Sequence, residues 1–376
     1  MNLLFSEAEE ATAEAARAFF TRALPLEAVR AAEAAEPWFP AEVWRELLAQ
    51  AWLPPLLGPD GAGPDDLISL AIVFEAMGSA AFSSPFLGSC VLAPLILRSS
   101  GPTDTNLALI RELTAGRQTA ALALHEAQAG DEWVSPRSVT GAADGPGWRI
   151  RGTKHLVPFA AQADVLLVTA DLDDQGPAVI RIARAAAEAA GQLRLRKQEV
   201  IGGDPCYRVD LDGLQAGPED LIVPLPNLDR VLHDGSNLAA LLETAYATGL
   251  CERALSMTVK HAGSREQFGQ PIGAFQAVAF HCAGMRLEVD ACRYLTYKAA
   301  ARVDGKGNGD LELSSAVAYA AQAVRQNLRD AHQVFGARGF SREYDLYLLA
   351  ERAKAFELSN GTRRKHLRRV AELIGL

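Results

Sequence analysis

A short stretch in the last third of the chain concentrates side chains suited to recognising a phosphorylated ligand. It reads Arg-Glu-Gln-Phe-Gly-Gln-Pro-Ile-Gly-Ala-Phe-Gln from Arg265 to Gln276. A guanidinium such as that of Arg265 offers a planar fork of donors to phosphate, and glycines let the backbone approach closely. Phe268 offers a flat apolar surface, while Gln276 and the distant Gln333 offer amide hydrogen bonds. These residue types could contact a phosphorylated ligand, and a helix–helix turn carrying a surface arginine is the alternative.

Other chemistries find little support in the residue spacing. No pair of histidines has metal-ligand spacing backed by carboxylates, so we predict no metal site. No G-x-S-x-G turn and no Walker phosphate loop occurs. His125 and His155 fall in the strand-rich middle of the chain, where they are either structural or electrophilic groups. Five scattered cysteines without a C-x-x-C spacing predict reduced thiols in a cytoplasmic protein.

A dense basic run occupies residues Arg363 to Arg369 near the C-terminus. Apolar residues interleave with it at helical spacing, which predicts an amphipathic helix with a solvated cationic face. Contacts with nucleic acid, with the phosphates of a substrate or with an acidic partner are the alternatives. The sequence does not separate them.

The elements that must position these residues follow a helix–strand–helix order. Residues 1–117 carry apolar side chains at helical spacing, as in Val43, Trp44, Leu47 and Leu48. Residues 118–226 alternate short apolar runs with glycine, proline and aspartate clusters, which is typical of strands and turns. Helical spacing returns over residues 227–376. We therefore expect an α+β chain with an N-terminal helical domain, a middle β domain and a C-terminal helical bundle; the Ala-rich residues 184–190 fit either a helix or a loop.

The bulk properties set limits on the class of protein. At 376 residues the chain is too long for one compact core and favours two or three domains. A net charge of -9 argues against nucleic-acid binding by the surface as a whole. No apolar run approaches the roughly 20 residues of a membrane span. The acidic N-terminal residues open an amphipathic helix and do not resemble a signal peptide.

The segment from Arg265 to Gln276 closely resembles the flavin-binding signature of the acyl-CoA dehydrogenases, FAD enzymes that oxidise the α,β-bond of acyl thioesters. The stretch Gln333–Phe340 resembles their second flavin segment, and Arg151-Gly-Thr-Lys154 resembles their G-x-K turn. The resemblance covers essentially the whole chain. It implies that FAD is bound by these residues: Arg265, Gln267, Phe268, Gln276, Gln333, Gly336 and Thr362. In the family these groups reach across a dimer interface to the ADP half of the FAD in the neighbouring subunit.

The expected catalytic base is missing from the chain. Where the family places a glutamate before Gly-Thr, this chain has Asn360, which cannot accept the proton from Cα. Some family members carry the glutamate earlier, at a position that falls on Ala239. Glu243 lies one helical turn further and is the nearby carboxylate candidate, with a solvent-facing glutamate as the alternative reading.

Residues that would contact a flavin ring in the chain's own pocket have also changed. Residues 125–131 read His-Glu-Ala-Gln-Ala-Gly-Asp in place of the family's Thr-Glu-Pro and Gly-Ser-Asp. Residues 156–158 read Leu-Val-Pro in place of Trp-x-Thr, and Arg364 replaces a glutamine. Residues for a neighbour's flavin are thus kept while those for the chain's own flavin are lost.

Three functions follow as hypotheses. The first is a base-deficient subunit that completes the FAD site of a related, glutamate-bearing acyl-CoA dehydrogenase subunit in a heterotetramer. The second is a self-sufficient homo-oligomeric flavoenzyme that acts on acyl-CoA, using Glu243 or a reaction without an α-proton base. The third is a binding protein without turnover, including a nucleic-acid binder through the basic helix.

Overall fold

The N-terminal part of the chain folds into helices around one largely buried helix. The computed structural model describes residues 5–35, 38–53, 55, 66–99, 101, 103–127, 138–202, 204–223, 228–304, 309–359 and 363–376. The N-terminal elements are α1 (Glu7–Ala23), α2 (Leu26–Glu33), α3 (Ala41–Leu48), α4 (Leu67–Ser79), the π-helical turn η1 (Phe86–Leu92), α5 (Ala93–Ser99) and α6 (Asp104–Thr114). Helix α4 is apolar on nearly all sides, and most of its residues are buried. Such a helix belongs in the core, with the amphipathic helices around it.

The middle of the chain forms an eight-stranded sheet in the part that the structure describes. Its strands are β1 (Ala120–Ala123), β2 (Thr140–Asp144), β3 (Gly147–Pro158), β4 (Val165–Leu172), β5 (Gly176–Ala183), β6 (Leu193–Gln198), β7 (Cys206–Ala216) and β8 (Leu221–Val223). The order is β6-β7-β3-β2-β4-β5-β8, with β1 paired in parallel with β4. The undecided Ala-rich segment forms helix α7 (Arg184–Ala189), followed by a turn.

Strand β4 explains how the sheet joins the helices. Its residues are an almost continuous apolar run, and alternate side chains enter two different cores. Leu166 and Val168 pack inside the sheet region, whereas Leu167 packs with α5, α6 and the start of the next long helix. A strand covered on both faces reads as a continuous hydrophobic run, as this one does.

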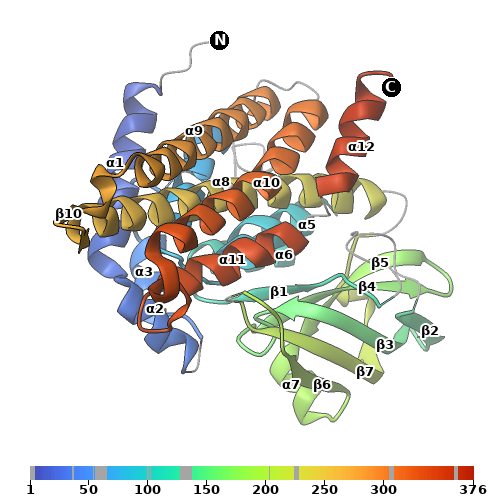
Figure 1. Ribbon diagram of the computed structural model, residues 1–376. Helices are drawn as coiled ribbons and strands as arrows, with labels where there is room; N and C mark the ends of the chain where they lie inside the picture. Colours follow the sequence, from blue (N-terminus) through green and yellow to red (C-terminus); the bar gives the residue numbers. More distant parts are fainter. Residues whose placement is uncertain are drawn as a thin grey trace.

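The C-terminal part is a bundle of long helices (Figure 1). It comprises α8 (Leu228–Ser264), the short strands β9 (Glu266–Gln267) and β10 (Gln270–Pro271), the 3-10 turn η3 (Ile272–Ala274), α9 (Gln276–Asp304), α10 (Asp310–Phe335), the 3-10 turn η4 (Gly336–Phe340), α11 (Leu346–Ser359) and α12 (Arg363–Leu373). Helices α8, α9 and α10 pack on one another, and α12 packs on α10. The basic run therefore forms a helix as expected, with none of its residues buried.

The predicted α+β architecture of helices, sheet and helical bundle is confirmed. Strand β1 begins at Ala120 and α8 at Leu228, so we propose domain boundaries near residues 117 and 226. No helix in the described ranges is long and apolar enough to cross a membrane.

Candidate functional site

The segment from Arg265 to Gln276 forms a tight hairpin between α8 and α9. The amide N–H of Arg265 donates to the carbonyl of His261, and the carbonyl of Arg265 accepts from the amide of Ile272, both at 2.8 Å. Phe268 and Gly269 form the turn with φ of 54° and 82°. Two positive φ angles are expected in the commonest two-residue hairpin turns, where a phenylalanine is strained. The turn presents the Phe268 side chain to solvent with 93% of the residue exposed.

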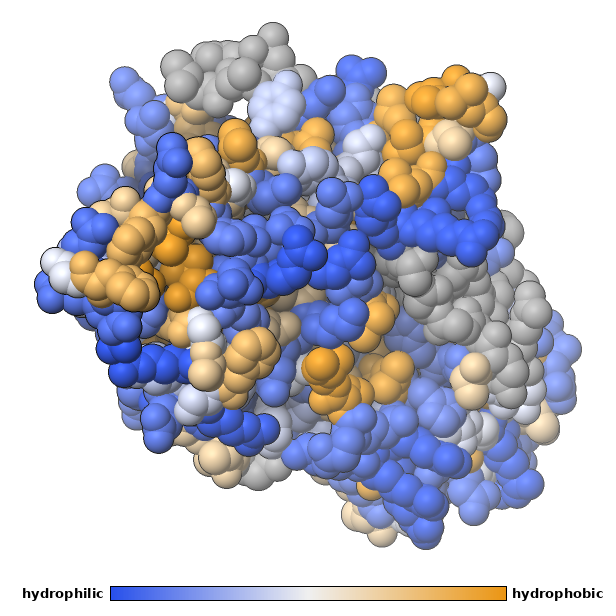
Figure 2. Space-filling view, viewed as in Figure 1, coloured by the Kyte–Doolittle hydropathy of each residue, from blue (hydrophilic) through white to orange (hydrophobic). Residues whose placement is uncertain are grey.

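This hairpin lies far from the chain's own sheet. In Figure 1, β10 marks the end of the α8–α9 pair that points away from β1–β8. Arg265, Gln267 and Gln276 are also exposed there. Apolar side chains reach the surface over the same end of the molecule (left side of Figure 2). These groups therefore cannot serve a ligand bound to the sheet of the same chain.

The second predicted segment lies against the base of the hairpin. The ring of His261, in the last turn of α8, stacks on that of Phe335, in the last turn of α10, with centroids 4.3 Å apart. Gln333 and Gly336 flank Phe335 and are exposed. Gly336 ends α10 with a φ of 63°, a conformation that glycine adopts without strain. The fold thus brings together two segments that are well separated in the sequence.

Glu243, the candidate for the missing catalytic base, lies where α8 contacts α11. Asn360 and Thr362 lie outside the described residues. The preceding residue, Ser359, donates its hydroxyl to Oε2 of Glu243 at 3.2 Å. Ala239 is buried among apolar side chains of α5 and the sheet. Glu243 is therefore the carboxylate that the fold brings next to the segment where the base was expected.

A buried ion pair lies where the sequence predicted altered flavin contacts. Lys154, on β3, has no exposed surface and donates from Nζ to Glu126 Oε1 at 2.7 Å and to Thr169 Oγ1 at 2.8 Å. Burial lowers the pKa of Lys154 to about 8, although hydrogen bonding and charge attraction from Glu126 oppose this. Glu126 also accepts from the amide and hydroxyl of Ser138, each at 2.8 Å. The pair ties the segment after β1 to β3 and β4.

A backbone hydrogen bond joins the two histidines of the sheet region, His125 and His155. The amide of His155 donates to the carbonyl of His125 at 3.0 Å. Leu156 follows with a φ of 51°, and its amide donates to Gln198 Oε1 at 2.8 Å. Leu156 is 46% exposed, so an aliphatic side chain faces solvent where the family carries a tryptophan. Within the described residues, no group of three His, Cys, Asp or Glu side chains could hold a metal.

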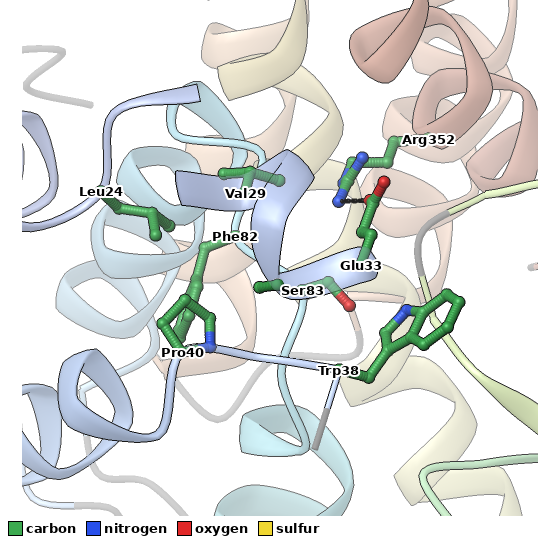
Figure 3. A pocket seen from close by; sticks show the side chains of 9 residues that line it. Leu24, Val29, Glu33, Trp38, Pro40, Phe82, Ser83 and Arg352 are labelled. Atoms are coloured by element: carbon green, nitrogen blue, oxygen red, sulfur yellow. Dashed lines mark hydrogen bonds and ion pairs between the residues drawn. The ribbon is translucent and has the colours of Figure 1, made fainter. Parts of the chain in front are cut away.

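A pocket lies between α2, the segment after α4 and α11 (Figure 3). The guanidinium of Arg352 is almost fully buried there and bonds to Glu33, while its Nε has no partner. Ser83 lines the same pocket and donates to Asp204 at 2.5 Å. The sequence reasoning did not find Arg352. Its position on the apolar stripe of α11, between Leu348 and Phe356, was the available signal.

Comparisons with known proteins assign the class. The family model for the acyl-CoA dehydrogenase C-terminal domain matches residues 232–375. The acyl-CoA dehydrogenase FadE27 of Mycobacterium tuberculosis is 29% identical over 358 residues, covering 89% of this chain and 88% of the relative. The chain thus resembles the acyl-CoA dehydrogenases over most of its length, and this likeness indicates FAD as the cofactor.

Two solved structures share this fold at more than a quarter sequence identity. The ChsE4-ChsE5 complex of Mycobacterium tuberculosis contains a chain with 26% identity and a TM-score of 0.84, matched over 100% of this chain and 99% of that one. A structure described as a variant of the Tcur3481-Tcur3483 steroid ACAD contains a chain with 27% identity and a TM-score of 0.81, matched over 98% of each chain.

Proposed function

We propose that this chain is a cofactor-completing subunit of an FAD-dependent acyl-CoA dehydrogenase. The main observation that supports this proposal is the position of the hairpin from Arg265 to Gln276. The hairpin is exposed at the end of the bundle opposite the sheet. A ligand held by these residues must have its remainder bound by another subunit. The ChsE4-ChsE5 complex among the structural relatives supports this arrangement.

The exposed groups fit the ADP half of FAD. Arg265 offers a fork of donors to the diphosphate, and Phe268 offers a flat apolar contact. Gln267, Gln276 and Gln333 supply amide donors and acceptors, and Gly336 allows close backbone approach. We assign the same role to Thr362, by its place in the sequence alone. When bound, FAD supplies the two-electron acceptor for oxidation of an acyl thioester at its α,β-bond.

The partner in this proposal is a related subunit that retains the glutamate. Asn360 cannot take a proton from Cα, so the reacting acyl-CoA belongs in the partner's pocket. The relative described as a steroid ACAD favours a bulky, ring-bearing acyl group as the substrate class of the assembly.

The contact between Glu243 and Ser359 favours a second candidate function. In that case the chain is a homo-oligomeric acyl-CoA dehydrogenase, and Glu243 removes the α-proton. The carboxylate is partly buried beside the end of α11, where the family's base segment follows.

One purification experiment distinguishes the cofactor-completing subunit from the homo-oligomeric enzyme. The chain is expressed alone and with a glutamate-bearing relative, and FAD per polypeptide is measured from flavin absorbance. A colourless chain that becomes yellow in the co-purified complex supports the completing-subunit function. A stoichiometric yellow chain that oxidises acyl-CoA unaided contradicts it.

Substitution of Glu243 then tests the second candidate. Glu243→Gln should lower the turnover of a self-sufficient enzyme by at least about 100-fold, since general-base catalysis contributes that much. Asp234→Asn, a change of an exposed carboxylate on the same helix, is the matched control. Equal turnover for both variants would exclude Glu243 as the base.

A further inference from the structure

The hairpin end of the bundle carries a second arginine that the flavin signature does not include. Arg338 lies in η4, two residues after Gly336, and is exposed. Its Cζ lies 6.0 Å from the ring centroid of Tyr344. Arg265 and Arg338 thus belong to the two segments that the His261–Phe335 stack brings together.

The turn that presents Arg338 is fixed on both sides. The ring of Phe340 stacks on that of His332 with centroids 4.6 Å apart. Gly339 is buried, and a Cβ at this position would come within 2.9 Å of Nδ1 of His332. Residues 337 and 338 therefore lie at the exposed end of a fixed turn. The fold itself positions the guanidinium of Arg338.

Two arginines, Arg265 and Arg338, are exposed at this end of the bundle, and neither forms an ion pair among the described residues. The pKa of His261 is lowered by burial first, and then by the charges of Arg338 and Arg265. Both guanidinium groups therefore act on the same imidazole. Like charges held together in this way form an anion site, since a bound anion removes their repulsion.

We propose that Arg338 is the second cation of a two-arginine clamp, with Arg265, for the diphosphate of the FAD bound across the subunit interface. This inference rests on the proposed function and extends it by one residue. Two guanidinium groups match the two charges of a diphosphate, and each charge-assisted hydrogen bond is stronger than a neutral one.

Affinity for FAD in the purified FAD-containing assembly tests the clamp. Arg338→Gln should weaken FAD binding by about 10- to 100-fold, the range expected for a lost charge-assisted hydrogen bond, and Arg338→Lys should restore part of it. ADP as a competitor should lose affinity in parallel, whereas adenosine should not. Arg342→Gln is the matched control, because Arg342 is also exposed and lies over a tyrosine ring, that of Tyr347.

The outcomes separate this inference from the proposed function. If Arg265→Gln weakens FAD binding and Arg338→Gln does not, the clamp is wrong and the completing-subunit function stands. If Arg265→Gln leaves FAD binding unchanged, the proposed function fails and the clamp with it.

A measurement on the chain by itself gives an independent check. Arg338→Gln should raise the pKa of His261, followed by NMR of the imidazole protons, because one repelling cation is removed. An unchanged His261 titration would show that Arg338 does not face the site.

Discussion

At the scale of single residues, the ion pair of Lys154 and Glu126 shows how a charged side chain is kept inside the sheet region. Lys154 is completely buried, and Glu126 and Thr169 accept from its ammonium group. The carboxylate in turn receives two donors from Ser138. Burying ions is costly, so such a pair is stable only when each charge is matched and hydrogen-bonded.

Removal of the lysine should therefore be strongly destabilising. We expect Lys154→Met to lower the free energy of unfolding by about 3 kcal/mol, because Glu126 stays buried with its charge uncompensated. Arg149→Met, on the same strand, removes a partner of the exposed Asp144 and should cost less than about 1 kcal/mol. Urea unfolding measures both.

The same ion pair predicts how the free energy of unfolding changes with pH. The pKa of Lys154 is about 8 in the folded chain against 10.5 unfolded. Between pH 8 and 10.5 Lys154 is protonated in the unfolded chain but neutral in the folded chain. The free energy of unfolding of the unsubstituted chain therefore rises with pH relative to that of Lys154→Met. The gain should approach about 1.4 kcal/mol per pH unit. A stability difference that stays constant from about pH 7.5 to 10 would contradict the buried, shifted lysine.

At the scale of elements, the crossing of α4 and α8 depends on two glycines. A Cβ on Gly249 would lie 1.9 Å from the carbonyl oxygen of Glu75, and one on Gly78 would lie 1.9 Å from that of Tyr246. Both contacts involve backbone atoms, which cannot move aside without separating the helices. The two helices therefore pack at a distance that only glycine permits.

Alanine at this crossing should separate the helices. We expect Gly249→Ala to lower the free energy of unfolding by about 3 kcal/mol or more, because overpacking a tight contact is destabilising. Gly263→Ala, on the same helix, meets nothing within 4 Å. It should be neutral or stabilising by up to about 1 kcal/mol, since alanine favours helix over glycine. Equal midpoints of thermal unfolding for the two variants would refute the close crossing.

At the scale of the whole molecule, buried thiols link stability to alkaline pH. Burial raises the pKa of Cys206 and Cys292 to about 12, and raises those of Cys90 and Cys251 as well. These residues come from η1, β7, α8 and α9, so the effect is spread over the fold.

We expect the free energy of unfolding to fall as the pH rises above about 9. The folded chain keeps its thiol protons while the unfolded chain loses them, so the unfolded state binds fewer protons and stability decreases with pH. Cys292→Ala should make the decline shallower by up to about 1.4 kcal/mol per pH unit. Urea unfolding in reductant between about pH 7.5 and 10.5 measures this decline. If the free energy of unfolding falls with pH equally steeply in the unsubstituted chain and in Cys292→Ala, the prediction is wrong.

The sequence by itself determined the class of fold and revealed a resemblance to a flavin signature. Helical spacing, strand-and-turn composition and the stretch from Arg265 to Gln276 are local properties, so they can be read without coordinates. The same holds for the missing glutamate at Asn360. These features indicated the family and the cofactor, and raised the question about the base.

Only the tertiary structure decided which distant groups meet. The contact of Glu243 with Ser359 joins residues 116 positions apart. The ring stack of His261 on Phe335 brings together the helix ends that precede Arg265 and Arg338. Lys154 is a charged residue whose burial no local pattern measures. Such features depend on how helices cross and strands pair, because burial and proximity are set by the whole fold rather than by neighbours in the chain.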